Sequence, residues 1–289
     1  MNTAMNTVNQ TFNWSRFTAA LRKEAVENNR TILFTILGIY ALLSIVMILG
    51  NLFTGMNGET LEDVKEMGDG ILPHYMVVGY ILTFAAAIVA SFSFKKLTRK
   101  TGRIDMFTSP ASTFEKFLVN VTIYVLGFIV VYFICAQLAD LTRVAVLWYF
   151  RDDIIVPGPI NFLPTLTQAY NFGPMGKMMG VSKLFTLSVL TNAGLFLLGS
   201  VVWPRLSFLK TFAAMYAVEI ILGILFIAGA FIIGNNNAIA VTLWIGRAVE
   251  NGYFKYFIAG LIIVQLILYW GLAWFLFKRK DVISLKWWK

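Results

Sequence analysis

The chain has 289 residues, of which 58% are hydrophobic and only 13% are charged, and its mean hydropathy is +0.72. Soluble globular proteins carry charge on about a quarter of their residues, so this composition excludes that class and indicates an integral membrane protein. The formal net charge is +9, and the sorting of charge between the two sides of a membrane explains it without a nucleic-acid partner.

Six apolar runs are each long enough to cross about 30 Å of hydrocarbon, which takes about 20 helical residues. The predicted spans are Thr31–Phe53, His74–Phe94, Phe117–Ala139, Lys183–Trp203, Phe212–Ile233 and Phe254–Phe277. The expected fold class is therefore all-α, a polytopic membrane protein in which residues 1–289 form a single transmembrane domain.

Residues 1–30 are expected to form a cytoplasmic tail and an amphipathic helix. From Asn13 to Arg30, the apolar residues Trp14, Phe17 and Leu21 recur every three or four positions, and charged residues cover the other faces. This pattern is typical of a helix that lies in the membrane interface. The alternative is a solvated extension of the first span.

The distribution of charge predicts the orientation of the spans. Most of the 24 Lys and Arg residues lie in the N-terminal tail, in residues 95–116, in the turn after the fourth span and in the tail 278–289. Cytoplasmic loops carry such an excess of basic residues, whereas the first loop on the opposite side, residues 54–73, is acidic. Both termini are therefore expected in the cytoplasm.

Two outer segments have unusual composition. Residues 140–182 form a long outer loop that contains four prolines and several aromatic residues, so part of it is expected to lie on the membrane surface or to cap the bundle. Residues 234–253 include about twelve mostly apolar positions, too few to span a membrane. A short re-entrant or interfacial helix before the last span is the expected structure.

The loop at residues 95–116 has the most detailed polar sequence. Six of the basic residues lie in it: Lys95, Lys96, Arg99, Lys100, Arg103 and Lys116. Gly102 is expected to end a helix, a short helical piece is expected to follow, and Pro110 interrupts it. Ser112 and Glu115 then form an S-x-x-E capping box ahead of the third span. This pattern predicts a docking surface between two helices.

Catalytic chemistry in this chain is not expected. The single His excludes H-E-x-x-H and multi-His metal sites, and no metal site is predicted. The Gly-rich stretch from Gly173 to Lys177 lacks the spacing and the hydroxyl residue of a P-loop, because Met178 follows the lysine. Any ATP dependence would have to come from a partner protein.

Glu219 lies in the fifth predicted span, where a carboxylate is costly and usually faces a cavity or a partner. It could line a pathway, accept a proton or bind a cation. Alternatively, it is a protonated side chain that bonds to Gln265, Asn192 or Tyr124 across helices. Glu219, Gln265 and Asn192 are the candidate residues of a translocation pathway.

Taken together, these features resemble the membrane subunit of a type-2 ABC exporter. In that family, the loop between spans two and three carries a Gly-x-x-acidic turn followed by a Pro-small-Ser sequence. The matching residues are Gly102, Arg103, Ile104, Asp105, Met106 and Phe107, then Pro110, Ala111 and Ser112, with Glu115 and Lys116 following. The run Ser109–Lys116 is similar to permeases of Bacteroidetes, which implies that the protein lies in a bacterial cytoplasmic (inner) membrane.

The resemblance implies a coupling helix near Gly102–Thr108 that docks on a separate ABC-type ATPase subunit. ATP and magnesium would bind that subunit, and this chain would hold no cofactor. It also implies a dimer with a second copy or a paralogue, and a re-entrant segment at Gly234–Tyr253. Arg103, Asp105, Met106 and Phe107 are the expected coupling residues.

Three functions therefore remain open at this point. The first is the transmembrane subunit of an ATP-driven exporter. The second is a proton- or cation-coupled secondary transporter that uses Glu219, although no inverted repeat supports it. The third is a non-transporting membrane anchor or regulatory subunit that uses the same loop. The sequence selects no substrate among peptides, lipids, polysaccharide precursors and small toxic compounds.

Overall fold

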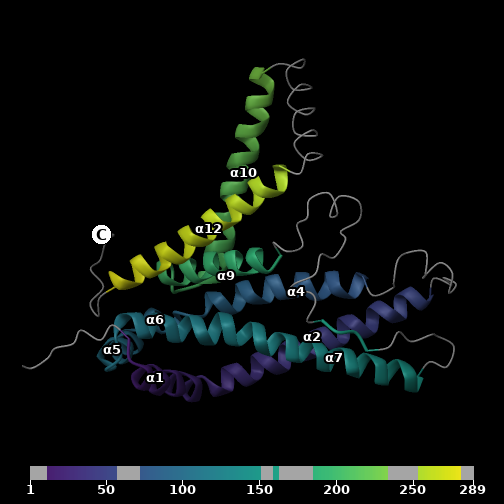
Figure 1. Cartoon of the computed structure of the whole chain (residues 1–289), viewed down its shortest axis with the longest axis horizontal. Coiled ribbons are helices and arrows are strands. Elements are labelled where there is room, and N and C mark those ends of the chain that lie inside the picture. The colour runs from purple at the N-terminus through teal and green to yellow at the C-terminus, as the bar shows by residue number, and fades with distance from the viewer. Residues whose placement is uncertain (1–11, 57–71, 151–158, 163–184, 234–252, 281–289) are drawn as a thin grey trace, which may run out of the picture.

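The computed structural model describes residues 12–56, 72–150, 159–162, 185–233 and 253–280, and all regular structure in these ranges is helical (Figure 1). The elements are α1 (Trp14–Glu27), α2 (Asn29–Met56), α4 (Leu72–Ser91), the 3-10 turn η1 (Lys95–Thr98), α5 (Lys100–Thr108), α6 (Thr113–Val121), the π-helical η2 (Thr122–Gly127), α7 (Phe128–Phe150), α9 (Phe185–Val202), α10 (Ser207–Ile233) and α12 (Tyr253–Lys278). The prediction of an all-α fold is confirmed for this part of the chain.

Within the described ranges, five helical segments are long and apolar enough to cross a membrane. They are Asn29–Gly50, Thr113–Phe150, Phe185–Val202, Ser207–Gly229 and Tyr256–Lys278. The predicted second span overlaps α4, whose apolar part Val77–Ser91 is shorter. Six spans therefore stay a prediction. The expected re-entrant segment at 234–253 lies almost wholly outside the described residues, as do residues 163–184 and 281–289.

The third predicted span differs from the observed helix at its far end. The sequence predicts an end at Ala139 and a loop from Asp140, but α7 continues through both to Phe150. Asp140 and Arg143 form an ion pair one turn apart inside the helix. Because the two charges satisfy each other and are buried, these polar residues do not end the helix as their polarity suggested.

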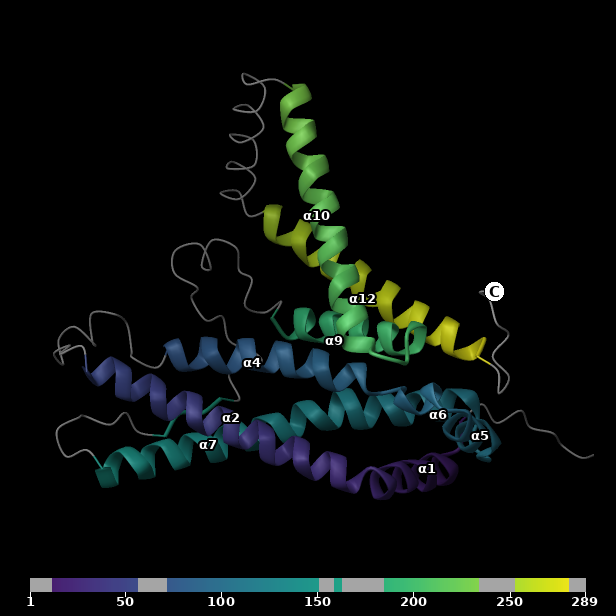
Figure 2. The same ribbon diagram turned by 180° about the vertical axis from the view of Figure 1, so that it is seen from behind.

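The helices form a layered bundle from which one helix projects. Helices α2, α4 and the continuous α6–η2–α7 run side by side, α9 packs on α4, and α12 packs on α9 (Figures 1 and 2). The main core includes Leu43, Val78, Leu82 and Tyr132. The Tyr132 hydroxyl donates to the Val78 carbonyl at 2.7 Å, which satisfies the largest polar group inside this core.

The contacts of α9 depend on two glycines. A Cβ atom on Gly194 would overlap the indole of Trp270 on α12, and one on Gly199 would overlap the Thr211 hydroxyl on α10. Small residues permit such close approach of membrane helices. The pairing of α9 with both neighbours therefore requires glycine at these positions.

The segments predicted to be cytoplasmic meet at one end of the bundle, called the basic end here. Arg16 of α1 forms an ion pair with Glu115 at the start of α6. The Thr98 hydroxyl donates to the carbonyl of Pro204 in the turn after α9. Phe277, near the end of α12, belongs to the same hydrophobic cluster as Leu97 of η1 and Phe107 of α5. Their gathering at one end is compatible with the predicted topology.

Helix α10 extends away from the bundle (Figure 1). Near its start, Phe208 packs on Phe84 of α4 and on Phe196 of α9. Farther along, its large apolar side chains are 56–61% exposed; they include Val218, Ile220, Ile221, Leu222, Ile224 and Leu225. Most of this apolar helix is therefore left uncovered by the rest of the described chain.

Candidate functional site

The loop between α4 and α6 is built from two short helical pieces. After Ser91 the chain turns into η1 and then into α5, whose bounds include the whole predicted coupling helix Gly102–Thr108. The prediction that Gly102 ends a helix is wrong, because this residue lies in the first turn of α5. A Cβ atom there would lie 2.5 Å from the Lys96 carbonyl oxygen. Glycine is needed for the close packing of α5 on η1.

The end of α5 and the start of α6 are fixed by hydrogen bonds. The Lys116 ammonium donates to the Phe107 carbonyl in the last turn of α5 at 3.2 Å, a favourable position for a cation. The predicted capping box of α6 is confirmed: the Glu115 amide donates to the Ser112 hydroxyl, and the Ser112 amide donates to the Glu115 carboxylate. The loop thus holds a defined conformation between two helices.

Glu115 also contacts the start of α1. Its carboxylate accepts hydrogen bonds from the Asn13 amide at 2.6 Å and from the Arg16 guanidinium at 3.0 Å, and its side chain is fully buried. Asn13 is the N-cap of α1 and accepts from the Ser15 amide through its own side chain. One buried carboxylate therefore joins the start of α1 to the start of α6.

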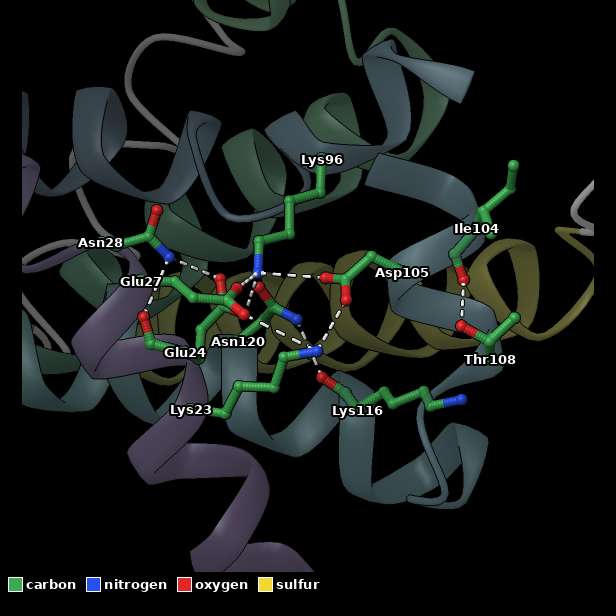
Figure 3. Close-up of polar contacts among 10 residues, drawn as sticks. All are labelled: Lys23, Glu24, Glu27, Asn28, Lys96, Ile104, Asp105, Thr108, Lys116 and Asn120. Atoms are coloured by element: carbon green, nitrogen blue, oxygen red, sulfur yellow. Dashed lines mark hydrogen bonds and ion pairs between the residues drawn. The ribbon is translucent and has the colours of Figure 1, made fainter. Parts of the chain in front are cut away.

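A second contact joins α1 to the loop through five charged side chains, called the charged cluster. Lys96 of η1 lies between Glu24 and Glu27 of α1 at 2.5 and 2.6 Å, and Lys23 of α1 donates to Asp105 of α5 at 2.7 Å (Figure 3). The carboxylates and ammonium groups alternate across the interface. The predicted interfacial helix α1 is confirmed as a helix, and its polar face binds the loop.

The charged side chains of this cluster shift one another's pKa values. The hydrogen bond from Lys23 lowers the pKa of Asp105 and raises the pKa of Lys23. Burial alone would lower the pKa of Lys96, but hydrogen bonds to Glu24 and Glu27 outweigh it and raise that pKa. The charged forms are thus favoured on both sides of the contact at neutral pH.

The inner side of α5 packs on an aromatic cluster of Phe94, Phe107, Phe117 and Phe277. Phe94 and Phe277 have ring centroids 4.8 Å apart, and Phe107 stacks on Phe277 at 6.3 Å. Met106 packs against the same group. Of the expected coupling residues, Met106 and Phe107 thus pack on a cluster whose other members include residues of the α4–η1 junction, α6 and α12, and Asp105 contacts α1.

The opposite side of α5 is exposed. A stripe of four residues, called the outer stripe, forms it: Lys100, Thr101, Ile104 and Thr108. The Ile104 side chain is 50% exposed. Pro110 is also exposed, and Arg103 is half-buried on the inner side. The outer stripe is therefore the part of the predicted coupling helix that is open to a partner.

The candidate pathway residues lie on three different helices. The Asn192 amide of α9 donates to the Thr83 carbonyl of α4 at 3.1 Å, so it links two bundle helices. Glu219 on α10 and Gln265 on α12 are exposed. The hydrogen bonds recorded among the described residues include none from Glu219 to Gln265, Asn192 or Tyr124.

A buried polar site at the far end of α7 was missed in the sequence. Asp140 and Arg143 are both 0% exposed and pair at 2.7 Å. The second carboxylate oxygen of Asp140 accepts from the Ile160 amide, and the Gln137 amide donates to the Ile160 carbonyl. Residues 159–162 are thereby held on the bundle. The signal was an Asp and an Arg three positions apart next to an apolar run.

No family model, curated protein or solved structure matches this chain. Functional inference therefore depends on the residues and contacts above. Among the described residues, no group of three or more His, Cys, Asp or Glu is placed to hold a metal ion. What the loop offers chemically is a recognition surface of basic, hydroxyl and apolar side chains on a short helix.

Proposed function

We propose that this chain is the transmembrane subunit of an ATP-driven exporter, and that α5 is the element on which a separate ATPase subunit docks. The observation that carries the proposal is the outer stripe of α5. It is an exposed face on a short helix, at the end of the bundle where the basic residues gather. Basic residues near the spans favour the cytoplasmic side, where ATP is available to the partner.

The packing of α5 supports a role in transmitting motion. Its inner side contacts the aromatic cluster, whose members lie on the α4–η1 junction, α6 and α12. The charged cluster adds α1 to the same unit. A displacement of α5 by a partner would therefore move several helices together, because packed cores resist continuous deformation. Closure of the ATPase on ATP would supply the displacement in this proposal.

The exposure of α10 supports the proposed pairing with a second copy or a paralogue. An apolar helix can face lipid, but Glu219 lies on this exposed helix among isoleucine, leucine and valine. A carboxylate in hydrocarbon is costly unless it faces a partner or water. Pairing through α10 would place Glu219 between two copies, where a translocation pathway would lie.

The test is co-purification of the tagged full chain from gently solubilised native membranes. The expected result is a nucleotide-binding protein in stoichiometric amount with the wild type and its loss with Ile104→Glu. A matched control is Leu206→Glu, since Leu206 is also an exposed apolar residue at the basic end. Recovery of the wild-type chain alone, in a detergent that preserves other membrane complexes, would contradict the proposal.

A further inference from the structure

A large cavity lies beside the loop, and Thr101 at the start of α5 is its one lining residue from the outer stripe. It has a volume of about 770 Å³ and is lined by residues of α1, α2, the junction of α4 with η1, the start of α5, η2 and the start of α7. This volume is in the range of sites that bind small molecules. Lys96 belongs both to the charged cluster and to the lining of the cavity.

The walls of the cavity within the helical layer are apolar. Ile32, Ile36 and Ile39 of α2 form one side, and Val89 of α4 and Val131 of α7 contribute to the others. These residues belong to helices that the sequence and structure make compatible with a membrane. A ligand that enters here must therefore bring apolar surface with it.

The cavity is basic at the end near the loop. Lys95, Lys96 and Arg99 line it, whereas none of the Asp and Glu residues in the described part of the chain does. Lys96 is paired with Glu24 and Glu27. Among the described residues, no carboxylate lies within 4.0 Å of Lys95 or Arg99. Two exposed positive charges thus stand at the mouth of an apolar cavity.

Local structure at the cavity differs from an ordinary helix bundle. The Lys95 ammonium lies 5.5 Å from the centroid of the Phe92 ring, which also lines the cavity. Three further lining residues, Thr122, Tyr124 and Gly127, belong to the π-helical segment η2. Such π-helical insertions occur frequently at functional sites. They place hydroxyl groups of Thr122 and Tyr124 on a wall that is otherwise apolar.

We infer that this cavity binds one anionic glycerophospholipid from the leaflet at the basic end. Its acyl chains would occupy the apolar part between α2, α4 and α7, and its phosphate would lie at Lys95 and Arg99. Charge complementarity selects an anionic headgroup, because the mouth is basic and its lining, as far as the structure describes the chain, includes no acidic residue. The bound lipid would fill the space between α1 and the bundle. The inference is independent of the proposed exporter function.

The experiment is native mass spectrometry of the full-length protein after delipidation and addition of lipid in detergent. The probes are phosphatidylglycerol and phosphatidylcholine with the same acyl chains. We expect one phosphatidylglycerol per chain, bound at least about tenfold more tightly than phosphatidylcholine. Because each basic residue near an anionic headgroup contributes about a fivefold factor, Lys95→Gln with Arg99→Gln should weaken binding about thirtyfold.

The matched control is Arg205→Gln with Lys210→Gln, which removes two exposed basic residues near the turn after α9 and leaves binding unchanged. Equal binding of the two lipids would overturn the inference, as would equal binding by the Lys95/Arg99 variant and the wild type. Inorganic phosphate at millimolar concentration should not displace the lipid; displacement would show a phosphate site instead.

A second pair of variants tests the apolar part of the cavity. Thr35 of α2 lines it, whereas Leu37 on the same helix is 52% exposed and does not. Thr35→Phe should fill the space and reduce phosphatidylglycerol binding at least about tenfold, and Leu37→Phe should not. If the basic variant fails to give a monodisperse protein, this pair decides: wild-type binding by Thr35→Phe would overturn the inference.

Discussion

Glu115 is a residue whose local and distant roles can be separated. Its capping of α6 could be predicted, because the S-x-x-E pattern acts within four residues. Its hydrogen bonds to Asn13 and Arg16 could not, since they join positions about a hundred residues apart. The same limit applies to Lys23 and Asp105, which are paired only by the tertiary fold.

Replacement of Glu115 should reduce stability according to how many of these bonds are lost. Glu115→Ala removes the cap and leaves the Asn13 amide without its carboxylate partner, so a loss of about 2–3 kcal/mol is expected. Glu115→Gln keeps hydrogen-bonding capacity and should cost about 1 kcal/mol. Thermal unfolding of the purified protein in detergent measures both. A wild-type melting temperature for Glu115→Ala would contradict the role given to this carboxylate.

The Asp140–Arg143 ion pair predicts that mutations of these two residues have strongly non-additive effects on the free energy of unfolding. Asp140→Ala leaves a buried Arg charge without its carboxylate and should cost about 3–5 kcal/mol. Asp140→Leu combined with Arg143→Met removes both charges and should be less harmful than either single change. A double-mutant cycle of unfolding free energies tests this. Additive losses would mean that the two side chains do not depend on each other.

At the scale of elements, the helical pieces of the loop could be predicted, but their packing contacts with one another and with the rest of the chain could not. The short helix α5 and the start of α6 follow from local sequence signals, and both are confirmed. Gly102 was misassigned because its need for glycine arises from the Lys96 carbonyl on η1, a contact that composition does not reveal. The same packing places Met106 and Phe107 inside, which leaves Ile104 as the apolar residue of the outer stripe.

The contact of α1 with the loop should depend on pH. The pKa of Asp105 lies below its ordinary value of 3.8, so its contribution is complete above that pH and is lost as the pH falls through the lowered pKa. The pKa values of Lys23 and Lys96 lie above 10.5, so their contribution is lost as the pH rises through the raised values. The contact should therefore persist through the neutral range.

Spin labels on the exposed residues Arg22 and Lys100, in a Cys135→Ala background, can measure this contact as a distance distribution. We expect a narrow distribution at pH 7 that broadens below pH 3.8. Asp105→Asn should broaden it already at pH 7. Labels on Leu42 of α2 and Val130 of α7 serve as a control for the bundle. A distribution unchanged by both acid and Asp105→Asn would contradict the role of the charged cluster.

At the scale of the whole molecule, the lateral order of the helices could not be predicted. The spans are apolar on all sides, so their sequences do not indicate which face packs on which neighbour. The close contacts of Gly194 and Gly199, and the exposure of α10, appear only in the assembled bundle. The basic segments could be grouped on one side from charge alone, and their gathering at one end is compatible with that prediction.

Pairing of two copies through α10 predicts a specific cross-link. In a Cys135→Ala background, Leu222→Cys places a thiol on the exposed side of α10, where Leu222 is 59% exposed. Oxidation in native membranes should give a disulfide-linked dimer. Ile45→Cys, at a similarly exposed position of α2, is the control and should stay monomeric. Equal cross-linking at both positions, or none at Leu222→Cys, would contradict pairing through α10.

The docking of an ATPase on α5 is tested most directly by photocross-linking from two positions of that helix in native membranes. A photoreactive phenylalanine analogue replaces Ile104 on the outer stripe or Met106 on the inner side. We predict that position 104 captures a nucleotide-binding protein and that position 106 reacts only within the chain, because Met106 packs on the aromatic cluster. Absence of a partner at position 104, or equal capture from both positions, would contradict the docking of an ATPase on this helix.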